Sequence, residues 1–153
     1  MKIYRLILIV LLIIPSACGY KVLNNLDNYK FKIVKYELTG EKNINNILER
    51  NFKRFKENDS GNLDISIKGE SISIRNIISK DTAGEPLAYE TEITIKLEIY
   101  KDNNLLSNKV FTESTSYDNL NSKFELKQYE NILINDLVDQ IINKINTHLN
   151  FIE

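Results

Sequence analysis

A run of twelve residues in the middle of the chain alternates strictly between two kinds of side chain. In YETEITIKLEIY, residues 89–100, every odd position from Ile93 to Ile99 is aliphatic, and the even positions are mainly charged. Side chains alternate between the two faces of a β-strand, so this pattern predicts a strand with one buried face and one hydrated face. Antiparallel sheets commonly keep one hydrated face. We therefore expect a sheet that is covered on one side only.

Two segments before this run also alternate, but less regularly. Residues 31–37 predict a short strand with Phe31, Ile33 and Lys35 on one face. Residues 62–76 predict a longer strand, in which the aliphatic residues occupy odd positions before Gly69 and even positions after it. Because a slip of one residue would turn the core face outward, a bulge near Gly69 is the simplest way to keep both halves on the core.

Turn-forming residues separate the expected strands. Residues 59–62 (DSGN) predict a turn, and residues 79–86 (SKDTAGEP) predict a loop, because Gly and Pro interrupt regular structure. Residues 101–104 (KDNN) predict a hairpin turn, since Asp and Asn tolerate the left-handed backbone that tight hairpins need. Residues 105–117 would then be the hairpin partner of the central run.

Two further segments have helical spacing. In residues 42–57, apolar side chains recur every three or four positions, and basic residues lie between them: Arg50, Lys53, Arg54 and Lys56. We interpret this basic cluster as the hydrated side of an amphipathic helix, and binding of lipid phosphates is the alternative. Residues 123–149 predict a long helix, whose apolar stripe is formed by Leu126, Tyr129, Leu133, Leu137, Ile141, Ile145 and Leu149.

The order of these elements is β-α-β-β-β-α. It predicts an α+β fold, a two-layer sandwich in which a four-stranded, mostly antiparallel sheet carries two helices on one face. Residues 31–153 would form this single domain. A chain near this size buries roughly 68–70% of its unfolded surface, which is enough for a real core.

The first residues of the chain have the features of an export signal. Lys2 and Arg5 precede an apolar run of nine residues from Leu6 to Ile14, and small residues follow it. A membrane-spanning helix needs about 20 apolar residues, so the run is too short to span a bilayer. It fits a signal peptide of residues 1–17. Residues 18–30, which are mainly polar, would then be the N-terminus and an extended tether.

Cys18 is the one cysteine of the chain, so an exported product cannot form an internal disulfide. Ala17 followed by Cys18 resembles the lipobox of bacterial lipoproteins, in which the chain is cut before a cysteine that carries lipid. Pro15 departs from that pattern, which usually has Leu at this position, and an ordinary signal with an incidental cysteine is the alternative. By the same resemblance Gly19, in place of a retaining Asp, implies the periplasmic side of the outer membrane.

Few residues suggest catalysis or metal binding. Without residues 1–17 the chain has 18 basic and 21 acidic residues, which is not the basic footprint of a nucleic-acid-binding protein. His148, the one histidine, would favour the C-terminus of its helix, and it has no partner nucleophile or set of zinc ligands. Glu90, Glu92 and Glu98 share a strand face that we interpret as hydrated rather than catalytic. We expect no catalytic residue, metal or cofactor.

The sequence CGY at residues 18–20, together with the order of elements, resembles the LPS-assembly lipoprotein family LptE. Members often have a Lys-Asp-Thr loop before a strand that starts with Tyr, as in KDTAGEPLAYETEI, and a Ser/Tyr-rich stretch after the hairpin, as in VFTESTSYD. The resemblance implies an outer-membrane lipoprotein that plugs the β-barrel of the LPS translocon, an LptD-like protein. Such a protein would support lipopolysaccharide transport.

The resemblance also implies candidate contact residues for the barrel. Lys80, Asp81, Tyr89 and Glu90 lie in the matching loop and strand, and the polar face of that strand would meet the barrel wall. In some members a basic residue at the tip of this loop contributes to LPS binding. The tip of this chain has Glu85 and no cation, so we do not carry that site over, and direct contact with LPS stays open.

A second interpretation is a lipid-carrier or ABC-transport accessory lipoprotein with a similar fold. A carrier needs a sizeable apolar cavity. Lipid that co-purifies with the protein would therefore distinguish this interpretation from the barrel plug.

Overall fold

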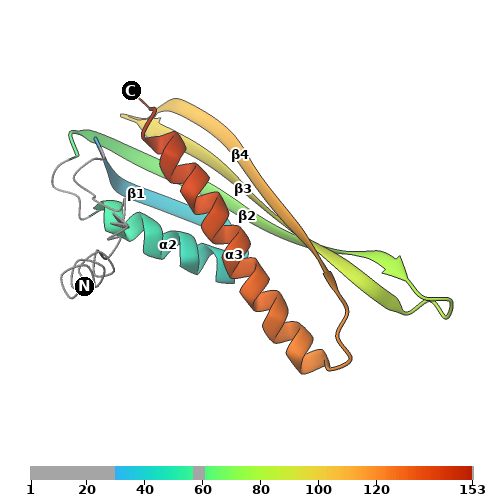
Figure 1. Cartoon of the computed structure of the whole chain (residues 1–153). Helices are drawn as coiled ribbons and strands as arrows, with labels where there is room; N and C mark the ends of the chain where they lie inside the picture. Colours follow the sequence, from blue (N-terminus) through green and yellow to red (C-terminus); the bar gives the residue numbers. More distant parts are fainter. Residues whose placement is uncertain (1–29, 57–60, 153) are drawn as a thin grey trace, which may run out of the picture.

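Two helices cover one face of a four-stranded sheet in the computed structural model, which describes residues 30–56 and 61–152 (Figure 1). The elements are β1 (Phe31–Gly40), α2 (Lys42–Lys56), β2 (Leu63–Lys80), β3 (Pro86–Lys101), β4 (Asn104–Asp118) and α3 (Lys123–Leu149). The strands follow chain order across the sheet. Strand β1 is parallel to β2, and the other pairs are antiparallel. The predicted α+β two-layer sandwich is therefore confirmed.

The N-terminal predictions cannot be compared with the structure. The signal peptide of residues 1–17, the lipid-attachment residue Cys18 and nearly all of the tether of residues 18–30 lie outside the described residues. The same holds for the first half of the predicted turn at residues 59–62. Within the described part of the chain, neither helix is both long enough and apolar enough to cross a membrane.

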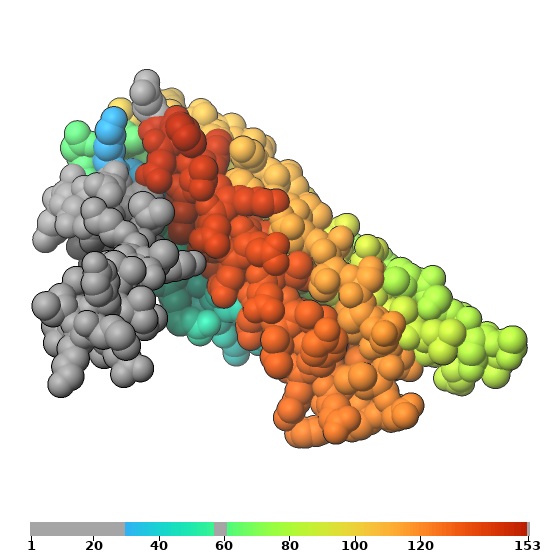
Figure 2. All heavy atoms as spheres, in the orientation of Figure 1, coloured from blue at the N-terminus to red at the C-terminus, as the bar shows by residue number. Residues whose placement is uncertain are grey.

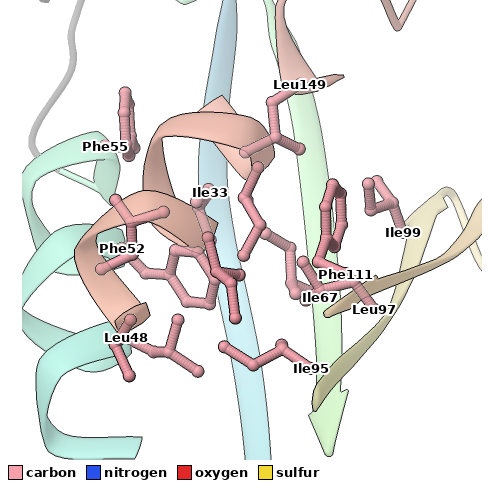
Figure 3. Packing of buried hydrophobic residues seen from close by; sticks show 14 of the residues in the cluster. Ile33, Leu48, Phe52, Phe55, Ile67, Ile95, Leu97, Ile99, Phe111 and Leu149 are labelled. Atoms are coloured by element: carbon pink, nitrogen blue, oxygen red, sulfur yellow. The ribbon is translucent and has the colours of Figure 1, made fainter. Parts of the chain in front are cut away.

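The core lies between the helices and the covered face of the sheet (Figure 3). The four aliphatic odd positions of β3 are all fully buried, as the alternation predicts: Ile93, Ile95, Leu97 and Ile99. Helix α2 contributes Leu48, Phe52 and Phe55 from one side. Burying a side chain of this kind stabilises a fold by about 1.5–3 kcal/mol, so this layer supplies the main stabilisation of the sheet.

Strand β1 is longer than predicted and contains a bulge. Its pairing with β2 shifts between Ile33 and Lys35, which leaves Val34 as the extra residue. After this bulge the core side passes to Tyr36 and Leu38, which pack against the buried cluster, while Lys35 is exposed. The prediction that Lys35 shares a face with Phe31 and Ile33 was therefore wrong, because a bulge changes the phase of the side chains.

Strand β2 lacks the bulge that was predicted near Gly69. Its pairing with β3 is continuous from Ser66 to Ile77, so the alternation simply continues through Gly69 and Ser71 on the core side. Position 69 takes a small residue because the Leu38 side chain of β1 fills the space above it. A Cβ on Gly69 would lie 2.7 Å from the Leu38 side chain. Ser71 donates a hydrogen bond to Asn45 at 2.8 Å. Ile72 and Ile74, which the sequence placed on the core, therefore face the uncovered side.

The predicted loop of residues 79–86 is much shorter in the structure. Strand β2 continues to Lys80 and β3 begins at Pro86, so five residues form the turn. The pairing is irregular between Ile77 and Lys80. We call residues 76–90 the arm, because this end of the hairpin extends away from the helices as the yellow-green projection of Figure 2. The β3–β4 turn agrees with prediction, with Asp102 and Asn103 both left-handed.

Helix α3 spans the predicted residues, but its apolar stripe is buried only in part. Ser122 caps its N-terminus by accepting a hydrogen bond from the Glu125 amide at 3.3 Å. Leu126 is buried and so is the stripe from Leu137 onward, whereas Tyr129 is 41% exposed and Leu133 is half-buried. The placement of Tyr129 in the buried stripe was wrong, because α2 lies only beside the later turns of α3 (Figure 1).

Gly40 provides a test of the connection between β1 and α2. Its φ is +97°, and a Cβ would lie 1.9 Å from the Ser71 carbonyl oxygen. Gly84 in the arm has a similar φ of +88° with no atom near its Cβ position. We expect Gly84→Ala to lower the free energy of unfolding by about 1 kcal/mol through backbone strain alone, and Gly40→Ala to lower it by about 3 kcal/mol or more. Urea unfolding measures both, and equal losses would contradict this account.

Candidate functional site

All four predicted contact residues lie in the arm. Lys80 ends β2 and Asp81 begins the turn, and both side chains are exposed. Tyr89 and Glu90 are half-buried neighbours in β3 that point to opposite faces of the sheet. The structure therefore places these residues at one end of the molecule, but it does not bring their side chains together into one cluster.

Asp81 organises the turn of the arm. Its carboxylate accepts hydrogen bonds from the amides of Ala83, at 2.9 Å, and Glu85, at 2.8 Å. The Asp81 amide donates to the Glu85 carbonyl at 2.9 Å, and Gly84 adopts the left-handed backbone that the turn needs. This is the usual way in which Asp stabilises a tight turn. The side chain predicted as a partner contact thus also holds the tip of the arm in one shape.

Tyr89 belongs to a group of side chains that joins the base of the arm to helix α3. The Arg75 guanidinium lies over the Tyr89 ring, 3.8 Å from its centre, and Arg75 Nε lies 3.0 Å from Glu130 Oε1. Tyr117 donates to the same Glu130 oxygen at 2.8 Å. The Thr91 hydroxyl is 3.1 Å from the Tyr117 hydroxyl and is buried. We call these five residues the clamp.

The clamp has the features of a preorganised structural contact. Burial raises the pKa of Tyr117, and its hydrogen bond to Glu130 raises that pKa further, so the hydroxyl stays protonated and can donate. Since Tyr117 donates to Glu130, the Thr91 hydroxyl is the donor to Tyr117. The Tyr89 and Tyr117 rings lie 5.8 Å apart, which adds aromatic packing. The clamp therefore fixes the direction in which the arm leaves the domain.

Sequence reasoning named Tyr89 as a contact residue and missed the other four members of the clamp: Arg75, Thr91, Tyr117 and Glu130. Arg75 and Tyr117 come from different strands, and Glu130 comes from a helix that follows both of them. No local spacing relates three such positions. The one available signal was Arg75 itself, a hydrophilic residue on the core side of β2, where it pairs with Thr91.

A groove of about 700 Å³ lies between the base of the arm and the first turns of α3. Its lining carries both signs of charge: Arg75, Lys123 and Lys127 together with Glu85 and Glu130. Three side chains of the arm that do not line this groove are apolar and exposed. Ile77, Ile78 and Leu87 are each about half exposed, at 48%, 50% and 52%. Exposed apolar side chains gathered on a projecting element are typical of a surface that contacts another molecule.

The uncovered face of the sheet is polar in its centre, as the alternation predicts. Lys96 donates to Glu70 at 2.9 Å, and the hydroxyls of Thr94 and Thr112 lie 3.1 Å apart. Glu98 accepts a hydrogen bond from the Tyr100 hydroxyl. A hollow of about 320 Å³ on this face is lined mainly by charged and polar side chains. The face thus offers charges of both signs to a partner.

The remaining candidate residues do not form a reactive group. The basic residues of α2 are all exposed, and three of them lie in its last turn, where they favour the helix C-terminus. The described residues contain no group of three or more His, Cys, Asp or Glu side chains arranged to hold a metal ion.

His148 is packed against the sheet rather than free in the last turn of α3. Its Nε2 lies 2.9 Å from the Ser107 hydroxyl, and its ring meets the edge of Phe111. Burial lowers the pKa of His148, and the charge of Lys109 lowers it further. Burial therefore favours the neutral ring, which weakens the charge that His148 brings to the C-terminus of α3.

Tyr117→Phe tests the clamp. The change removes one hydroxyl that bonds both Thr91 and Glu130, so we expect the free energy of unfolding to fall by about 1–2 kcal/mol. Tyr100→Phe is the matched control, because it removes a hydroxyl on the uncovered face; its expected effect is below about 0.5 kcal/mol. Urea unfolding compares the two. Equal losses of unfolding free energy in the two variants would show that the Tyr117 hydroxyl stabilises the fold no more than a hydroxyl on the uncovered face.

His148→Gln tests the buried imidazole through pH. Because the pKa of His148 is lower in the folded than in the unfolded chain, the unfolded chain binds more protons, and stability falls as pH drops through about 6.5. We expect the free energy of unfolding to decrease between pH 7.5 and pH 5.5, and the decrease to be smaller in the variant. Identical pH dependence in both proteins would contradict the burial of a neutral ring.

Comparison with known proteins supports the fold. No family model matches the sequence, and no curated protein matches it. The solved structures that resemble it include three with TM-scores above 0.5. Rare lipoprotein B from Shewanella oneidensis has a TM-score of 0.54 and 10% identity, over 74% of this chain and 95% of that chain. The minor lipoprotein from Acinetobacter baumannii has a TM-score of 0.54 and 19% identity, over 78% and 94%.

The third structure, uncharacterized lipoprotein B from Nitrosomonas europaea, has a TM-score of 0.57 and 17% identity, over 83% of this chain and 87% of that chain. Identities this low relate folds and do not transfer functions. The elements that these proteins share with this chain make up most of each of them. The described domain therefore has the fold of these bacterial lipoproteins.

Proposed function

We propose that this chain is a lipid-anchored lipoprotein on the periplasmic side of the outer membrane, where it plugs the β-barrel of the LPS translocon and supports lipopolysaccharide transport. The observation that carries the proposal is the arm, a clamped hairpin with exposed apolar side chains, on a fold shared with bacterial lipoproteins. The resemblance of the sequence to the LptE family, with Cys18 as the lipid-attachment residue, supplies the identity of the barrel.

The geometry of the domain fits a plug. Large barrels have polar interiors that can hold a folded domain. The uncovered sheet face presents ion pairs and hydroxyls to such a wall, including the Lys96–Glu70 pair and the Thr94–Thr112 contact. The arm adds Ile77, Ile78 and Leu87, which would pack against apolar side chains of the partner. The role is binding rather than catalysis.

Affinity purification from detergent-solubilised outer membranes tests the proposal. We expect one large β-barrel protein to co-purify at about one copy per copy of this chain, identified by mass spectrometry. Recovery of the chain alone, or with an inner-membrane transporter, would contradict the proposal. Bound lipid in the same sample would then favour the lipid-carrier or ABC-transport accessory interpretation, and a panel of esterase and glycosidase substrates would test for a hydrolase.

Charge reversal and arm variants locate the contact. Lys80→Glu with Glu90→Lys, and separately Ile77→Asp with Leu87→Asp, alter exposed or half-buried side chains of the arm. We expect each pair to reduce barrel recovery at least threefold while the protein level stays the same. Lys53→Glu on the exposed side of α2 is the matched control and should leave recovery unchanged. Unchanged recovery in both arm variants would remove the arm from the interface.

A further inference from the structure

The two edges of the sheet differ in how well they are protected. Strand β1 forms one edge and β4 forms the other. Edge strands expose backbone groups that can pair with another strand, and proteins block this with bulges, charges or Pro. Strand β1 has the bulge at Val34 and the adjacent charged residues Lys35 and Glu37. Among the described residues no strand pairs with the outer side of β4. Strand β4 also carries charged residues, but it contains no Pro and, from Ser107 onward, no bulge.

The part of β4 that is available for pairing is long and regular. Its register with β3 is continuous from Ser107 to Asp118, and the one irregularity lies before it. Val110 on the uncovered face is 55% exposed. On the other face His148 and Lys144 of α3 contact β4, and a groove of about 660 Å³ lies beside these contacts. The outer backbone edge of β4 therefore offers hydrogen-bonding partners to an added strand.

Charge favours one register for a second copy, because only an axis at Phe111 pairs opposite charges within β4. Two identical strands that pair antiparallel are related by a two-fold axis perpendicular to the sheet, so each residue meets one from the same face. Lys109, Phe111 and Glu113 all lie on the helix-covered face. An axis at Phe111 places each Lys109 opposite Glu113 of the second copy. An axis at Lys109 or at Glu113 would instead place like charges opposite each other, which is unfavourable.

We propose that two copies of this chain associate through β4 in the register centred on Phe111, which joins their sheets into one continuous sheet. The pairing brings Val110 against Thr112 of the second copy on the uncovered face. It also places Lys109 of one copy beside Glu113 of the other, and that Glu113 already bonds Lys144 of its own chain. The proposal concerns copies of the chain that are free of the barrel, because a barrel that encloses one copy leaves no room for a second.

Cysteine pairs test the register directly in the full-length protein in detergent. Val110→Cys with Thr112→Cys places thiols opposite each other in the proposed dimer, whereas Val110→Cys with Ser114→Cys does not. With copper phenanthroline as the oxidant, we expect the first pair to give at least five times more crosslinked dimer than the second on a non-reducing gel. Wild type shows how much crosslinking arises from Cys18 alone. Equal crosslinking of the two pairs, or none above wild type, would overturn the proposal.

Charge reversal tests the same dimer without new thiols. Lys109→Glu places a carboxylate opposite Glu113 of the second copy in each of the two symmetry-related pairs. It leaves the bond between Glu113 and Lys144 intact. Opposed like charges replace attraction with repulsion, so we expect the dimer dissociation constant from sedimentation to rise about tenfold. Lys35→Glu, an equal charge change on the β1 edge, is the matched control and should leave it unchanged. A dimer dissociation constant that changes equally in both variants, or in neither, would contradict pairing through β4.

Discussion

The burial of one face of the sheet is the constraint on which the rest of this structure depends. Ile93, Ile95, Leu97 and Ile99 are completely removed from water by the two helices, and this layer holds all four strands together. Because the helices supply apolar cover on that side only, the opposite face must be satisfied by water, ion pairs or a partner. The same constraint produces both the stable core and the surface that is available for binding.

The arm illustrates how a projecting element can be held without a core of its own. Beyond the last helical cover, the hairpin has no apolar layer on either face, and its direction is set at its base. Arg75, Tyr117 and Glu130 connect two strands to α3 through one shared carboxylate oxygen. A preorganised arm loses less conformational entropy when it docks than a flexible loop would, which favours tight binding from a small surface.

Local pattern was enough to predict most elements of the fold, but not the phase of every strand. Strand β3 was predicted correctly because both of its neighbours keep its alternation. In β1 a bulge at Val34 moves the core side from Ile33 to Tyr36, and nothing in the local sequence requires it. In β2 the expected bulge is absent because Leu38 of another strand fills the space beside Gly69. The candidate contact residues were placed in the arm by resemblance, whereas the clamp was not found.

The sequence by itself determined the type and order of the elements, since periodicities of two and of about 3.6 residues are properties of single segments. It also determined which face of β3 would be dry. Only the tertiary structure decided the phase of β1 and β2, the length of the arm and its attachment to α3. Those features depend on the space that neighbouring elements leave and on contacts such as Arg75 with Glu130, which join residues far apart in the chain.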